Sequence, residues 1–322
     1  MIYALAITGP TASGKTSLSI RVAKELGCEI ISCDSMQIYK QMNIGTAKAT
    51  PEEQAAIPHH LIDVISPSES FSAMAYRDMA IAAARDIAKR GKIPLFVGGT
   101  GLYLTTLVRS ECDEVPASDP EYRRAIEEKI SSEEDRISLH ERLREVDPVS
   151  AEQIHYNNVR RVIRALEIYD MTGKPKSYFD EQSRKPSSDI SISHITLDFH
   201  DREVLYRRAD LRVGEMIAAG LEKEVKDLLD SGLLQPHYTS AQAIGYKEMI
   251  RAITKEASYD TAIAELKQAT RNYAKRQLTW FRHDDSAIKI WADTEEGYPK
   301  SQDELLGECI SVFKESLGKN KN

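Results

Sequence analysis

Residues 9–16 constrain the fold of this 322-residue chain more than any other stretch. They read Gly-Pro-Thr-Ala-Ser-Gly-Lys-Thr and fit the phosphate-binding loop (P-loop) pattern G-x-x-x-x-G-K-[ST]. The apolar run Ile2–Ile7 precedes them, and the amphipathic segment Thr16–Gly27 follows. This order predicts a buried strand, then the loop, then a helix that ends at Gly27. That is the structural setting in which the pattern binds phosphate.

The loop residues themselves predict a site for a diphosphate or triphosphate. Glycines allow backbone N–H groups to approach an anion, and the helix N-terminus adds unpaired N–H groups and a positive dipole end. Lys15 supplies a positive charge, and the hydroxyl of Thr16 is placed to ligate Mg²⁺. The predicted phosphate-binding residues are Gly9, Pro10, Thr11, Ala12, Ser13, Gly14, Lys15 and Thr16. The alternative, a Gly-rich turn with an incidental lysine, fits the full pattern less well.

Two further apolar runs end in polar residues that we expect beside this loop. Residues 29–33 lead into Asp34, and residues 93–97 lead into Gly98-Gly99-Thr100. Strands that alternate with helices indicate a parallel sheet, and such sheets bind ligands at the carboxyl ends of their strands. Asp34 has an alternative role as the cap of a following helix. The strand before Gly98 lacks the Mg²⁺-associated aspartate of P-loop NTPases, which argues against a plain ATPase.

The middle of the chain has a different character. From about Cys112 to Ser193, strand signals are nearly absent, and charged segments with helical periodicity predominate until a polar stretch, 176–193, that we expect to be a loop. A strand returns at Ile195. We therefore predict the α/β class: a P-loop NTPase-like parallel sheet flanked by helices, formed by residues 1–112 and 195–322, with an all-helical insertion domain at 113–194.

Composition and charge narrow the range of partners. The net charge is −7 and the isoelectric point about 5.7, so nucleic-acid binding would need local basic patches. Residues 271–283 interleave basic and aromatic side chains, a combination that binds phosphate and stacks bases, although an amphipathic packing helix is the commoner meaning of such a pattern. The four cysteines show no metal-binding spacing. No membrane-spanning run or signal peptide is recognisable, so we expect a cytoplasmic protein.

Several motifs taken together resemble the bacterial tRNA dimethylallyltransferases (tRNA isopentenyltransferases). They occur in family order and span nearly the whole chain: GPTASGKT (9–16), DSMQ (34–37), GTAK (45–48), HHLID (59–63), GGT (98–100) followed by GLY (101–103), RVIRALE (161–167), GYK (245–247) and KRQLTWFR (275–282). The P-loop is common to many proteins, but the combination of GTAK, GGTGLY and KRQLTWFR is specific.

The resemblance implies a reaction. The family transfers a dimethylallyl group from dimethylallyl diphosphate to N6 of adenosine 37, in tRNAs reading codons that begin with U, and releases diphosphate with Mg²⁺ as cofactor. It implies that Asp34 acts as general base and that Thr100 holds the bridging oxygen or the diphosphate. A small-molecule P-loop kinase or a non-catalytic RNA-binding protein are the rival interpretations. The implied partners are dimethylallyl diphosphate and the tRNA anticodon stem-loop, without a membrane, and we expect a monomer.

Further binding residues follow from the same resemblance or from position. Arginines at the sheet edge suit phosphate, and the candidates for the diphosphate are Arg202, Arg208 and Arg212, although each could instead lie on a solvated helix face. The insertion would clamp the tRNA. The implied tRNA-binding residues are Asp34, Ser35, Met36, Gln37, Thr100, Arg123, Arg160, Arg161, Arg164, Gly245, Tyr246, Lys247, Lys275, Arg276, Gln277, Trp280 and Arg282.

Overall fold

The computed structural model describes residues 1–109, 115–116 and 118–319. The chain divides into two compact units, one of Met1–Val108 with Asp189–Asn322 and one of Arg109–Ser188. Cys112, where the sequence changes character, lies outside the described residues.

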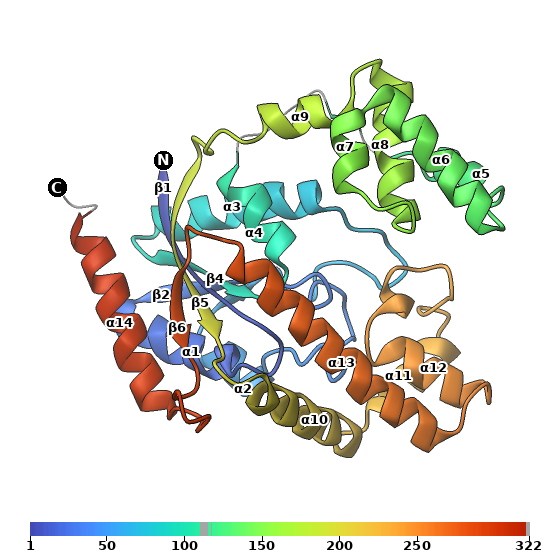
Figure 1. Ribbon diagram of the computed structural model, residues 1–322. Helices are drawn as coiled ribbons and strands as arrows, with labels where there is room; N and C mark the ends of the chain where they lie inside the picture. Colours follow the sequence, from blue (N-terminus) through green and yellow to red (C-terminus); the bar gives the residue numbers. More distant parts are fainter. Residues whose placement is uncertain (110–114, 117, 320–322) are drawn as a thin grey trace. The chain divides into compact units, whose positions relative to one another are not determined.

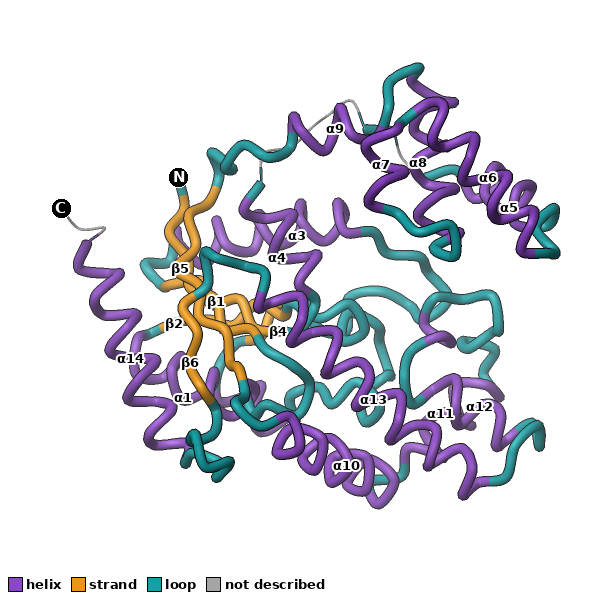
Figure 2. The backbone as a smooth tube through the Cα atoms, viewed as in Figure 1, coloured by secondary structure: helices purple, strands orange, loops and turns teal. Residues whose placement is uncertain are grey.

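The first unit is built on a six-stranded sheet with the order β3-β2-β4-β1-β5-β6. Figure 1 draws its strands as arrows, and Figure 2 draws them in orange. Every neighbouring pair of strands is parallel, which confirms the predicted sheet. The strands are β1 (Ile2–Thr8), β2 (Cys28–Ser32), β3 (His59–His60), β4 (Ile93–Gly98), β5 (Ile190–Asp198) and β6 (Ile288–Trp291). The carboxyl ends of β1, β2 and β4 therefore meet at one edge, where the P-loop, Asp34 and Thr100 follow them.

Helices cover both faces of this sheet because successive side chains of a strand point to opposite sides. Leu5 and Ile7 of β1 lie in one apolar cluster with α1 (Lys15–Leu26) and α14 (Gln302–Lys319). Ala4 and Ala6 lie in a second cluster with α3 (Ala73–Lys89) and α4 (Gly101–Val108). The strand before the P-loop is thus buried on both faces, as its apolar sequence predicts.

The remaining helices of this unit surround the carboxyl edge of the sheet. They are α2 (Pro51–Ala56), α10 (Arg202–Ala218), α11 (Leu221–Asp230), the 3₁₀ turn η1 (Ser240–Gln242), α12 (Tyr246–Ile253) and α13 (Tyr259–Arg282). Helix α13 contains the basic and aromatic residues and packs on α10 and α12 through buried positions such as Leu266, Ala274 and Leu278. No helix in the described part of the chain has the length and apolar character needed to cross a membrane.

The second unit, described by itself, has helices and no strand element among its described residues. It consists of α5 (Pro120–Glu127), α6 (Glu133–Val146), α7 (Pro148–Gln153), α8 (Val159–Thr172) and α9 (Lys176–Gln182) with their connections. Leu143, Val162 and Leu166 form the centre of its apolar cluster. Side chains of Asp119, Ser132 and Asp147 cap the N-termini of α5, α6 and α7, which explains where these charged helices begin.

Two expectations about the return to the sheet were wrong. Residues 176–193 are not a continuous loop, because α9 occupies part of them and β5 begins at Ile190 rather than at Ile195. Strand β5 starts early because the whole of β1 pairs with it, beginning with Ile2 opposite Ile190. Its polar residues find partners inside the fold, and Ser193 Oγ, for example, lies 2.9 Å from Ser316 Oγ. The short strand β6 was not predicted from the sequence.

Candidate active site

The P-loop joins β1 to α1, as predicted. Gly9 and Gly14 have positive φ angles of 147° and 87°, and Gly14 and Gly27 flank α1 at its two ends. A Cβ at Gly9 would lie 3.0 Å from the Cβ of Leu197, so the loop also needs glycine for space. Lys15 Nζ donates a hydrogen bond to the carbonyl oxygen of Pro10 at 3.1 Å. The buried hydroxyl of Ser13 has no hydrogen-bond partner among the described residues, which leaves it available to a ligand of the loop.

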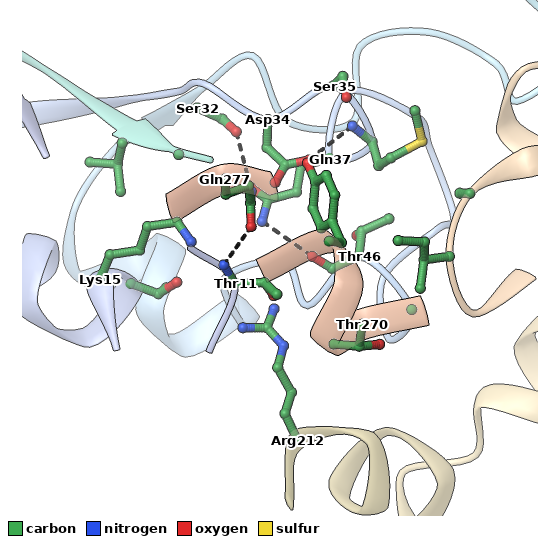
Figure 3. Close-up of a pocket in the computed structure, with 18 of the residues that line it drawn as sticks. Thr11, Lys15, Ser32, Asp34, Ser35, Gln37, Thr46, Arg212, Thr270 and Gln277 are labelled. Atoms are coloured by element: carbon green, nitrogen blue, oxygen red, sulfur yellow. Dashed lines mark hydrogen bonds between the residues drawn. The ribbon is translucent and has the colours of Figure 1, made fainter. Parts of the chain in front are cut away.

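A cavity of about 400 Å³ opens at this edge of the sheet (Figure 3). Lys15, Thr16, Asp34 and Arg212 all line it, although they come from three separate segments. Arg212 reaches into it from α10, and its buried Nε has no hydrogen-bond partner within the described chain. Burial, reinforced by the positive charge of Arg212, lowers the pKa of Lys15 to about 8. Two desolvated cations facing one cavity favour an anionic ligand.

The predicted diphosphate arginines differ in position. Arg212 lines the first cavity and also an adjoining cavity of about 880 Å³, which Arg208 lines as well. Arg208 Nε donates to the carbonyl oxygen of Ala12 at 2.8 Å, so this side chain is already attached to the P-loop. Arg202, by contrast, is exposed at the beginning of α10 and lines neither cavity. The structure therefore brings Arg208 and Arg212 to the loop, and leaves Arg202 outside it.

Asp34 follows β2 in a turn. Its Oδ1 accepts a hydrogen bond from the backbone N–H of Met36 at 2.9 Å, and residues 35–38 form turns, so the alternative of a helix cap was wrong. Within the described residues, Oδ2 of Asp34 has no hydrogen-bond partner. Thr100 Oγ1 accepts from the backbone N–H of Ser35 at 3.0 Å, and its own N–H donates to the carbonyl oxygen of Cys33 at 3.1 Å. The turn of Asp34 and the loop of Thr100 are thus held together.

The glycines around Thr100 are required by close approaches. A Cβ at Gly98 would lie 2.0 Å from the carbonyl oxygen of Cys33, and one at Gly101 would lie 2.1 Å from Nε1 of Trp280. A Cβ at Gly99 would lie 2.1 Å from Nε2 of Gln277. The segment from Gly98 to Gly101 is therefore packed against both Cys33, just after β2, and α13.

The KRQLTWFR segment contains both exposed and buried side chains. Lys275, Arg276 and Trp280 are exposed and available to a partner. Gln277 is buried and hydrogen-bonds with the backbone at Thr11 and Gly99, while Arg282 forms a bidentate ion pair with Asp198. The latter two side chains, predicted to bind tRNA, have internal partners in this structure.

Glu224 connects the start of the GTAK segment to the GYK segment by hydrogen bonds. Glu224 accepts hydrogen bonds from the backbone N–H groups of residues 43–45 and one from the hydroxyl of Tyr246, at 2.7 Å. A Cβ at Gly45 would lie 2.5 Å from the Tyr246 ring. Tyr246 is fully buried, so this geometry favours a supporting role, whereas Lys247 is exposed and lines the first cavity.

The other predicted residues of the first unit line the cavity. Ser35, Met36 and Gln37 do so together. Gln37 accepts from the hydroxyl of Ser32 at 3.0 Å and donates to the carbonyl oxygen of Thr46, which ties the Asp34 turn to the GTAK loop.

Within the helical unit, the predicted arginines fall into two groups. Arg123 and Arg164 both form ion pairs with the buried carboxylate of Glu167. Burial is the largest single contribution and by itself would raise the pKa of Glu167. The two ion pairs together with other hydrogen bonds outweigh burial, so the pKa is lowered overall. Arg160 and Arg161 are exposed on α8.

Sequence reasoning missed two residues of the site. Tyr273 lines the cavity, and burial raises the pKa of its hydroxyl. Glu224 holds the GTAK loop, as described above. Both follow an ordinary helical pattern. The backbone N–H groups of residues 43–45 need acceptors, and only this need could have indicated Glu224.

Comparison with known proteins identifies the family. The sequence model of the IPP transferase family matches residues 37–284. The chain belongs to the IPP transferase family. This confirms the resemblance noted from the motifs, and the protein is accordingly an enzyme of the transferase class.

Individual IPP transferases match over nearly the full chain. A tRNA dimethylallyltransferase of Geobacillus kaustophilus (strain HTA426) is 49% identical over 278 residues, which cover 86% of each chain. Another, from Thermoanaerobacter sp. (strain X514), is 42% identical over 306 residues and covers 95% of this chain and 96% of its own.

Solved structures support the fold. The tRNA delta(2)-isopentenylpyrophosphate transferase of Staphylococcus epidermidis is 37% identical, with a TM-score of 0.69, over 98% of this chain and 100% of its own. A eukaryotic dimethylallyltransferase acting on tRNA is 32% identical, with a TM-score of 0.74, over 90% of this chain and 74% of its own.

Proposed function

We propose that the protein transfers a dimethylallyl group from dimethylallyl diphosphate to N6 of adenosine 37 in tRNAs that read codons beginning with U. One observation carries the proposal: a carboxylate with a free oxygen, on Asp34, and two desolvated cations, Lys15 and Arg212, face the same cavity of the described chain. The Asp34 carboxylate suits a proton-accepting base, and the two cations suit a leaving diphosphate. The family and the names of its members support the same reaction.

At the diphosphate end, the residues stabilise developing charge. As the allylic C–O bond breaks, its electron pair goes to the diphosphate, and Lys15, Arg212 and the N–H groups of the P-loop neutralise the charge that accumulates there. These groups belong to the loop and to α10, so they are in place before the substrate arrives.

A Mg²⁺ ion fits this end of the site. No group of three or more His, Cys, Asp or Glu that could hold a metal occurs among the described residues, whereas Thr16, which carries a hydroxyl, lines both cavities. Mg²⁺ prefers hard oxygen ligands and retains waters, so Thr16 and the substrate's phosphate oxygens would hold it. When bound, it would supply further neutralisation of the diphosphate charge.

At the acceptor end, Asp34 receives the proton. The N–H of Met36 fixes Oδ1, which leaves Oδ2 for the exocyclic amine of adenine. As N6 forms its bond to the allylic carbon, the amine loses a proton to this carboxylate. Thr100 is held beside the Asp34 turn by the Ser35 N–H, from where it would contact the diphosphate oxygens. The adenine must leave the stack of the anticodon loop to reach this position.

The exposed basic residues would bind the RNA. Lys247, Lys275 and Arg276 suit the phosphate backbone, and Trp280, 44% exposed, offers a stacking surface. In the helical unit, Arg160 and Arg161 are the exposed candidates, in keeping with the proposed role of that unit in clamping tRNA. We expect the protein to act on tRNA in the cytoplasm and as a monomer.

Transfer of labelled dimethylallyl groups to an unmodified anticodon stem-loop tests the proposal. The matched control is the same RNA with guanosine at position 37, and we expect label only in the adenosine RNA. The Asp34→Ala variant should bind the RNA and fail to modify it. A folded protein that labels neither RNA in the presence of Mg²⁺ would refute the proposal and direct attention to a phosphoryl acceptor, as for a small-molecule kinase.

A further inference from the structure

We propose that Gln277 is a positioning residue of this site, whose carboxamide fixes the diphosphate-binding end and the acceptor end at a set separation. The inference rests on the proposed function, because it concerns the distance across which the prenyl group moves. It assigns to Gln277 a role inside the fold in place of the tRNA contact expected from the sequence.

The Gln277 side chain forms a bridge between two loops. It extends from α13, is 5% exposed, and reaches the cavity between the P-loop and the loop after β4 (Figure 3). Its Oε1 accepts from the backbone N–H of Thr11 at 2.8 Å, and its Nε2 donates to the carbonyl oxygen of Gly99 at 2.9 Å. A carboxamide is the group that can do both, because it carries an acceptor and a donor side by side.

The sequence at residue 99 is adapted to this bridge. A Cβ at Gly99 would lie 2.1 Å from the Gln277 Nε2, so the amide occupies the space of any side chain at that position. Glycine at 99 and glutamine at 277 therefore form a matched pair, 178 residues apart in sequence.

Each end of the bridge connects to one half of the chemistry. Thr11 belongs to the P-loop and lines the first cavity with Lys15. On the other side, Gly99 adjoins Thr100, which hydrogen-bonds to the N–H of Ser35, the residue after Asp34. A shift at Gly99 would thus move Thr100 and the turn of Asp34 relative to the P-loop.

The helix that carries Gln277 is firmly attached to the sheet. Arg282 forms a bidentate ion pair with Asp198 at the end of β5, and Ala274 and Leu278 pack in an apolar cluster with Phe199 and Leu205. The bridge therefore starts from a rigid element, as a positioning group requires. Reacting atoms must approach to about 3–3.5 Å, and a misplacement of about 1 Å can slow a reaction about 100-fold.

The first test compares Gln277→Ala with Gln268→Ala. Gln268 lies on the same helix but is exposed, and its amide contacts only the surface residues Arg271 and Asn272 among the described side chains. We expect kcat of Gln277→Ala to fall roughly 10- to 100-fold while the Kd for tRNA stays within about twofold. Gln268→Ala should match the wild type. A loss of tRNA affinity that accounts for the whole defect of Gln277→Ala would overturn the proposal in favour of a direct RNA contact.

A conservative variant and a double variant test the bridge itself. Gln277→Glu keeps the acceptor for Thr11 but cannot donate to Gly99 when ionised, so it should not restore kcat. Gly99→Ala should also be slow. The double variant Gly99→Ala/Gln277→Ala should be no slower than Gln277→Ala alone, because the Gln277 amide, which is the closest obstruction at residue 99, is gone. If the two single variants act independently, their factors of loss in kcat will multiply in the double variant. That result would contradict the pairing.

A readout independent of activity separates this inference from the proposed function. In hydrogen exchange followed by mass spectrometry, the peptide containing Thr11 should lose protection in Gln277→Ala and keep it in Gln268→Ala. Unchanged protection in folded Gln277→Ala would show that the bridge does not hold the loop. If the wild type transfers no prenyl group, the proposed function fails, and the exchange result still decides whether Gln277 holds the P-loop.

Discussion

Raising the pH from 7 to 9 should weaken the binding of dimethylallyl diphosphate about tenfold, through Lys15. Burial, with a smaller contribution from the positive charge of Arg212, lowers the pKa of this ammonium to about 8 in the ligand-free protein. Lys15 is thus about nine-tenths protonated at pH 7 and about one-tenth protonated at pH 9. Because the bound diphosphate favours the charged form, binding at pH 9 must first return a proton to Lys15.

The sign and size of the effect follow from this linkage. A lowered pKa means that the binding-competent, charged lysine is lost as the pH rises through about 8, so affinity falls on the alkaline side. The ratio of protonated fractions between pH 7 and pH 9 gives the factor of about ten, equivalent to about 1.4 kcal/mol of binding free energy.

Isothermal titration calorimetry at constant Mg²⁺ measures this directly. The ligand is dimethylallyl diphosphate rather than inorganic diphosphate, because the diphosphate ester lacks the last ionisation that inorganic diphosphate undergoes at alkaline pH. Titrations in two buffers of different ionisation enthalpy should show proton uptake near zero at pH 7 and approaching one proton at pH 9. The Lys15→Met variant should bind weakly and without this dependence. A flat wild-type affinity from pH 7 to 9, or an equal fall in Lys15→Met, would refute the reasoning.

Three further predictions concern the acceptor end and its glycines. Asp34→Asn, which keeps the shape but not the base, should lower single-turnover transfer about 100-fold or more with tRNA affinity unchanged in a filter-binding assay; normal transfer would remove Asp34 from the mechanism. Thr100→Ala should slow transfer more than it weakens RNA binding, and equal losses would contradict its role. Gly98→Ala should cost about 1–3 kcal/mol of unfolding free energy in urea, because its Cβ would lie 2.0 Å from the Cys33 carbonyl oxygen. The control Gly214→Ala, in α10 where a Cβ meets nothing within 4 Å, should leave stability unchanged or raise it by about 0.5–1 kcal/mol, and similar losses in both would refute the steric argument.

The sequence by itself determined the elements whose signals are local. The pattern at 9–16 lies between an apolar run and a helical period, so these residues alone were sufficient to place the strand, the P-loop and the helix. The same logic placed Asp34 and Thr100 at the carboxyl edge, because parallel strands all end there. The motifs were sufficient to identify the family, because their combination and their order along the chain are specific to it.

The tertiary structure alone decided which side chains face the cavity and which hold it together. Arg202 and Arg212 share one helix and one kind of sequence context, yet of these two only Arg212 turns inward. Gln277 and Tyr246 lie in motifs with exposed basic neighbours, and both prove to be buried supports. These roles depend on hydrogen bonds such as that from Thr11 to Gln277, between residues 266 positions apart. A local pattern can predict the period and polarity of an element, but partners at such separations are set only when the elements pack.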